Sequence, residues 1–231
     1  MSNPVPLAMI DRRSMIRNIA LAITAAGTLD LEAAQHVHTQ TAGEKAKTGE
    51  YKVKAFQPAE YLTLQRLAVI IVPADGISGS ALDAGAPEFI DTLASENEQL
   101  ADIFHGGLAW LDSEMRKRYN ATFVDARPEQ QKQMLDLLVA AEKEEADRRS
   151  EELVYQRSPT YKDFSGYTVQ RPSYLSPGVA FFDWVRKMTV DAFYTSPIGM
   201  KDIGFIGNQA LSQYTVPEEA IAYALKRSPF A

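Results

Sequence analysis

The 231-residue sequence contains no cysteine and only three histidines. The absence of cysteine excludes disulfides, thiolate nucleophiles, cysteine-ligated zinc and an iron–sulfur cluster held by this chain alone. An excess of positive charge is missing too, because the formal net charge is −6. A phosphate backbone requires a basic surface, so nucleic acid is excluded as a partner.

The spacings of common catalytic and nucleotide-binding motifs are also absent. The sequence has no H-E-x-x-H, no G-x-S-x-G, no phosphate-binding glycine loop and no dinucleotide fingerprint. No run of useful length alternates with the period of a strand, which predicts an all-α fold. We therefore expect no catalytic, cofactor-binding or metal-binding residue in this chain.

Four aspartates in otherwise informative stretches, Asp75, Asp91, Asp183 and Asp191, are better explained by structural roles. Asp75 follows a predicted helix end and can accept hydrogen bonds from the amides of a glycine-containing loop. Asp183 and Asp191 lie on one predicted helix, where each can pair with a lysine or arginine.

The histidines do not form a ligand set. His36 and His38 make an H-x-H pair in a polar stretch, and no third ligand stands near them, so we interpret both as solvated linker residues. His105 follows an apolar helical pattern and is interpreted as a packing histidine.

The N-terminus has the layout of an export signal. Arg12 and Arg13 precede a short, alanine-rich apolar run over residues 18–27, which is typical of a twin-arginine signal and too short to span a bilayer. We predict a signal region over residues 1–34, a polar linker over 35–56 that orders only on binding, and a helical domain over 57–231. An amphipathic first helix with two solvated arginines is the alternative.

The predicted domain contains several amphipathic helices. An apolar helix starts at Pro58 and stops at Pro73, a second covers 88–95, and a third covers 100–119 with Gly106 and Gly107 inside it. Two such glycines cost about 1 kcal/mol each relative to alanine, which predicts close approach of another helix. Further helices are expected over 128–153 and 220–226, with an aromatic loop over 155–174.

The stretch over residues 177–208 carries the longest apolar helical face. Ser176 and Pro177 predict the helix start, and Val179, Phe182, Val185, Met188, Thr189, Ala192 and Phe193 recur at helical spacing. Pro197, Gly199 and Gly204 then predict turns within a segment that stays apolar. We expect this segment to pack under the domain or against another protein.

Two blocks of residues resemble a known family. In the first, Val72-Pro73-Ala74-Asp75, Gly85-Ala86-Pro87 and Phe89-Ile90-Asp91 follow an apolar helix. In the second, Phe181-Phe182, Arg186, Met188-Thr189, Phe193 to Pro197 and Phe205 to Asn208 keep their order. Both blocks are similar to motifs of the gluconate 2-dehydrogenase subunit 3 family.

The resemblance implies a non-catalytic small subunit of a periplasmic or membrane-associated, FAD-dependent (GMC-type) sugar or sugar-acid dehydrogenase. In such complexes FAD belongs to the large subunit, a cytochrome c subunit often accepts the electrons, and the small subunit assists maturation and twin-arginine export through the translocase. We expect the large subunit to dock on Phe181, Phe182, Trp184, Phe193, Tyr194, Pro197, Phe205 and Asn208. The resemblance also marks a motif loop by Pro73, Asp75, Gly85 and Pro87.

A second hypothesis is a stand-alone periplasmic ligand-binding protein or enzyme that uses a pocket under the Pro73–Gly85 loop. A third is a cytoplasmic scaffold in which Arg12 and Arg13 have no targeting role. The sequence names neither the sugar nor the signal cleavage site.

Overall fold

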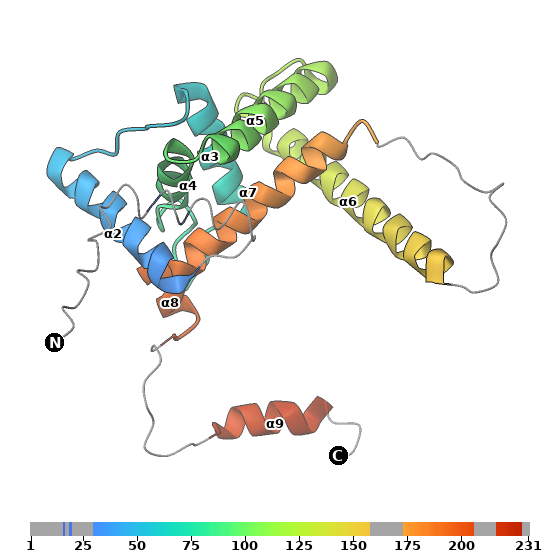
Figure 1. The fold of residues 1–231 in the computed structure, drawn as a ribbon. Coiled ribbons are helices and arrows are strands. Elements are labelled where there is room, and N and C mark those ends of the chain that lie inside the picture. The colour runs from blue at the N-terminus through green and yellow to red at the C-terminus, as the bar shows by residue number, and fades with distance from the viewer. Residues whose placement is uncertain (1–15, 17–18, 20–29, 158–172, 206–215, 228–231) are drawn as a thin grey trace, which may run out of the picture.

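The computed structural model describes Ile16, Ile19 and residues 30–157, 173–205 and 216–227. These parts contain helices and no strand, which confirms the all-α prediction (Figure 1). The helices are α2 (Leu31–Thr48), α3 (Pro58–Ile71), α4 (Ala86–Ser95), α5 (Glu98–Tyr119), α6 (Pro128–Arg157), α7 (Ser176–Thr195), α8 (Pro197–Asp202) and α9 (Glu218–Arg227).

Helix α7 is the centre of the body. It packs against α2, α3, α4, α5, α6 and α8 and runs across the molecule between them (Figure 1). All seven residues of its predicted apolar face are buried. The start differs slightly from the prediction, because Ser176 lies inside the first turn and its hydroxyl donates to Glu145 of α6 at 2.5 Å.

The crossing of α5 and α7 is tight because glycines lie on both helices. A Cβ on Gly107 would lie 2.0 Å from the Phe181 ring, and a Cβ on Gly178 would lie 2.1 Å from the Trp110 ring. Phe181 also meets Phe104 edge-on, with ring centroids 6.0 Å apart. The predicted close approach is confirmed for Gly107; Gly106 has nothing within 4 Å, and nothing in the structure explains it.

Helix α2 replaces most of the predicted linker, so the linker interpretation is wrong for residues 35–48. Ala34, Val37, His38 and Thr41 are buried in this helix, which packs against α4 and α7. The sequence gives only a weak apolar stripe here. Burial against two other helices, which a local pattern does not reveal, stabilises the helix.

The segment between α2 and α3 is held by one buried carboxylate. Asp91 of α4 is fully buried and accepts hydrogen bonds from the backbone N–H groups of Lys54, Ala55 and Phe56 at 2.8, 2.9 and 3.2 Å. The hydroxyl of Tyr51 donates to the same side chain at 2.7 Å. Residues 49–57 are therefore part of the folded body.

Two residues of the predicted signal region also belong to the core. Ile16 is 1% exposed and Ile19 is 8% exposed, and both join the apolar cluster that contains Val37 and Phe89. Arg12 and Arg13 lie outside the described residues, so the export prediction stays a prediction. No described helix is long and apolar enough to cross a bilayer.

Helix α6 is tied to α7 through its charged side chains. Arg186 of α7 donates to both carboxylate oxygens of Glu142 at 2.9 and 2.7 Å, and it also pairs with Asp183 at 2.9 Å. The predicted pairing of Asp183 with an arginine is confirmed. Most of the predicted aromatic loop lies outside the described residues.

Candidate partner-binding surface

The exposed end of the body begins where α7 turns into α8. The Ser196 hydroxyl donates to the Phe193 carbonyl at 2.6 Å and accepts the N–H of Gly199 at 3.1 Å. A Cβ on Gly199 would lie 2.1 Å from the Phe193 carbonyl oxygen, so only glycine fits there. The order Ser-Pro-x-Gly therefore encodes a sharp turn between two helices.

The α8 end, defined as Tyr194, Pro197, Ile203 and Phe205, presents apolar side chains to solvent. Tyr194 is 40% exposed, Ile203 57% and Phe205 41%. Gly204 closes α8 in the left-handed region at φ +64°, and the N–H of Phe205 donates to the Met200 carbonyl at 2.9 Å. Backbone hydrogen bonds thus fix the position of this surface before any partner binds.

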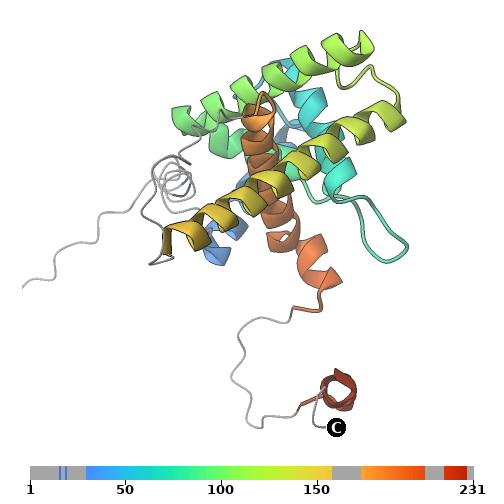
Figure 2. The same ribbon diagram turned by 90° about the vertical axis from the view of Figure 1, so that its right-hand side faces the viewer.

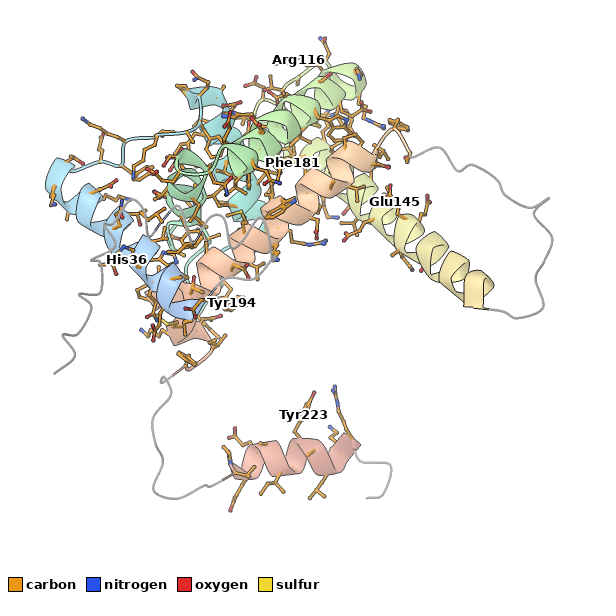
Figure 3. All side chains as sticks on the ribbon, in the orientation of Figure 1. His36, Arg116, Glu145, Phe181, Tyr194 and Tyr223 are labelled. Carbon is orange, nitrogen blue, oxygen red and sulfur yellow. The ribbon has the colours of Figure 1, made fainter. Side chains whose placement is uncertain are left out.

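Three of the predicted partner-binding residues lie elsewhere. Phe181, Phe182 and Phe193 are buried in this chain's own core, so the prediction that they contact a partner is wrong. Figure 3 shows Phe181 at the crossing of α7 with α5, and Tyr194 at the other end of α7. Trp184 is half-buried, and Asn208 lies outside the described residues. Helical spacing identified an apolar face without identifying what covers it.

The first motif block contains a loop over residues 72–85 that is closed by its own polar groups. Oδ1 of Asp75 accepts the N–H groups of Ile77 and Ser78 at 2.8 and 2.7 Å, which confirms the predicted cap. These two amides lower the pKa of the exposed Asp75 carboxyl. Oδ2 of Asp83 accepts both the N–H and the hydroxyl of Ser80 at 2.7 Å.

The other two motif-loop residues start α4. Gly85 is the N-cap residue with φ +73°, a conformation that favours glycine. Pro87 lies in the first helical turn and is buried. Pro73, by contrast, is exposed just beyond the end of α3. The motif is thus a helix–loop–helix connection in which Gly85 and Pro87 set the start of the second helix.

One residue of this loop was missed by the sequence patterns. Ile77 is 90% exposed, and Leu82 of the same loop is 38% exposed. The sequence does contain a signal for this exposure: Ile77 is a large aliphatic residue that is flanked by turn residues and lies outside any helical period. The loop projects from the same lower end of the body as α8 (Figure 2).

The structure contains a cavity that lies away from the loop used by the second hypothesis. A cavity of about 510 Å³ is lined by Lys54, Ala55, Ala94, Ser95, Glu96, Asn97, Glu98, Ala101 and His105. None of its lining residues comes from the 72–85 loop. No three His, Asp or Glu side chains of the described residues are grouped to hold a metal ion.

His38 is buried rather than solvated, which corrects the sequence interpretation. Its Nε2 lies 3.1 Å from the Thr195 hydroxyl of α7, and its ring lies 4.8 Å from that of Phe89. Burial lowers the pKa of His38 to about 4, and a hydrogen bond to the Ala192 backbone offsets part of the effect. His38 is therefore neutral in the fold at pH 7.

The remaining titratable candidates have structural partners. His105 packs against Phe56, as predicted, and also lies 2.9 Å from Glu60. Burial raises the pKa of the Asp191 carboxyl, and Lys187 offsets part of that effect. Asp91 anchors the backbone amides of residues 54–56 from the buried helix α4.

Comparison with protein families gives one match. The model of the family described as gluconate 2-dehydrogenase subunit 3 matches residues 58–212, which is more than half of the chain. A search of curated proteins and a search of solved structures found no match. The matched range starts with α3 and contains both the 72–85 loop and the α8 end.

Proposed function

Because the chain belongs to the gluconate 2-dehydrogenase subunit 3 family, we propose that it is the non-catalytic small subunit of an FAD-dependent sugar or sugar-acid dehydrogenase. In this proposal it assists the maturation of the catalytic large subunit and carries that subunit through the twin-arginine pathway to the periplasm. FAD resides in the large subunit, and a cytochrome c subunit accepts the electrons.

The α8 end is the observation that carries this proposal. Three large apolar side chains are exposed inside the family match: Tyr194 in the last turn of α7, and Ile203 and Phe205 just after α8. Backbone hydrogen bonds hold them without a partner, so little conformational entropy is lost when they are covered. An apolar, preformed surface of this kind suits stable association with a folded protein better than binding of a polar small molecule.

The ligand-binding alternative gains no support from the 72–85 loop. The carboxylates of Asp75 and Asp83 accept hydrogen bonds from the loop's own amides and hydroxyl. The cavity of about 510 Å³ lies at residues 54–55 and the α4–α5 junction instead. A polar substrate would need converging unsatisfied groups, and the loop uses its groups internally.

Affinity purification of the tagged full-length chain from its native cell envelope tests the association. We expect a stoichiometric partner with flavin absorbance and sugar-dehydrogenase activity. Replacing both Ile203 and Phe205 with Asp should abolish co-purification, whereas Val139→Asp, an exposed apolar site on α6, should preserve it. Recovery of a colourless chain without any flavoprotein would refute the proposed function.

The export role needs a separate test, because association does not require it. Replacing Arg12 and Arg13 with Lys should leave the dehydrogenase in the cytoplasm while co-purification from whole cells persists. Periplasmic dehydrogenase activity at the wild-type level in this variant would remove the export role and leave the association intact.

A further inference from the structure

The loop over residues 72–85 is built as a fixed projection. The N–H of Ala81 donates to the Val72 carbonyl at 2.9 Å, which joins the two ends of the loop. Asp75 caps one turn and Asp83 caps the next. A Cβ on Gly79 would lie 3.0 Å from the Asp83 side chain, so the second turn is tightly packed. The loop is therefore ordered by its own contacts.

This rigid loop carries Ile77 at its tip. At 90% exposure Ile77 is the most exposed large hydrophobic residue in the described parts of the chain. Its neighbours Ala74, Gly76 and Ser78 are small, so they leave the aliphatic side chain unobstructed. Leaving an isoleucine in water on a preorganised loop gives no stability to this chain, but burying it in a partner's pocket favours association.

We propose that the 72–85 loop is a second docking element for the dehydrogenase large subunit, with Ile77 inserted into an apolar pocket on that subunit. The inference rests on the proposed function, since it names where that partner is held. It assigns to docking a loop that the sequence alone associated with a small ligand. The loop and the α8 end project from the same end of the body, so one partner surface can cover both (Figure 2).

The negative charge of the loop indicates what kind of partner pocket can accept it and disfavours other partners. Residues 72–87 contain Asp75 and Asp83, both exposed, and no lysine or arginine. A pocket with basic residues at its rim is the complement of this loop. A second copy of the chain would bring like charges together, since its net charge is also −6, and an anionic membrane surface would repel the loop for the same reason.

Binding of the purified full-length chain to the purified large subunit tests the proposal. Ile77→Asp should weaken the dissociation constant at least about 100-fold, as expected when a charge replaces a buried anchor. Leu62→Asp is the matched control, because Leu62 is 53% exposed in the first half of α3 and lies outside the loop. Both substitutions replace exposed side chains, so circular dichroism and melting temperature should match those of the wild type.

The outcomes separate this inference from the proposed function. A loss for Ile77→Asp that exceeds the loss for Leu62→Asp by tenfold or more supports the docking element. If the wild-type chain binds but the two variants differ by less than tenfold, the docking element is overturned and the accessory-subunit function stands. Absence of wild-type binding to the large subunit rejects both. A photo-crosslinker placed at position 77 should join the chain to the large subunit; crosslinks to a second copy, or to nothing, also overturn the inference.

Discussion

Helices α7 and α9 both carry an apolar face, and the two faces lie in opposite environments. Every residue of the predicted α7 face is buried, and α7 contacts six other helices. In α9 all residues are exposed, including Ile221, Tyr223 and Leu225 on its apolar side. The family match also ends before α9 begins. An apolar stripe therefore shows which side of a helix is suited to be buried. It does not show whether this chain or another protein buries that side.

The largest effect is expected from a substitution at the tight crossing of α5 and α7, because it disturbs the buried face of α7. Gly107→Ala should lower the free energy of unfolding by about 2–3 kcal/mol, because the new Cβ would overlap the buried Phe181 ring. Chemical denaturation measures the change. Gly106→Ala is the matched control on the same helix; it meets no atom within 4 Å and should raise stability by about 0.5–1 kcal/mol. Equal effects at the two glycines would contradict the close crossing.

A smaller effect is expected at the contact of α2 with α7. His38 has a folded pKa of about 4, below the value of about 6.5 for an unfolded chain, so the unfolded state binds more protons as the pH falls. The contribution of neutral His38 to the free energy of unfolding is fully present above the unfolded pKa, and it is lost as the pH falls from about 6.5 toward 4. From pH 7 to pH 5 this group should cost about 1–2 kcal/mol of stability.

Comparison of wild type with His38→Gln isolates that contribution. Burial raises the pKa values of Glu88 and Asp191, so ionisation of these two carboxyls lowers the stability of the protein as the pH rises. This effect has the opposite sign to that of His38. Their effect is common to both proteins and cancels in the difference. Denaturation midpoints measured at pH 5, 6 and 7 should therefore diverge most at pH 7, where the wild type keeps its advantage. Parallel pH profiles would exclude a buried neutral His38.

The smallest effect is expected in α9. Replacing both Ile221 and Leu225 with Asp should change the free energy of unfolding by less than about 0.5 kcal/mol, because both side chains are already in water. The same double substitution on a buried face would unfold the domain. A loss above about 2 kcal/mol, measured by thermal denaturation, would mean that α9 packs on the body in solution.

Helix positions could be predicted well from local patterns. The helix starts at Pro58 and Pro128 follow from proline geometry, and the apolar face of α7 follows from a period of 3.6 residues. Both are properties of the chain itself. Asp75 could be assigned as a cap for the same reason, since it lies two residues before the amide that it binds.

The candidate surface could be predicted only in part. Pro197 and Gly199 indicated the turn that builds the α8 end, yet Phe181, Phe182 and Phe193 were expected at a partner and lie in the core. Apolar residues satisfy a core and an interface equally well, because both remove the same surface from water. Local sequence does not distinguish the two.

The sequence by itself determined the helical periods, the turn residues and the family, because each depends on neighbours within a few positions or on residue order. Tertiary structure alone decided that α2 is a packed helix, that Ile16 and Ile19 join the core, and that Asp91 anchors residues 54–56. It also decided that Ile77 faces solvent while Phe181 fills the space over Gly107. These outcomes depend on contacts between residues distant in sequence, and the free energy of such contacts exists only once the helices have come together.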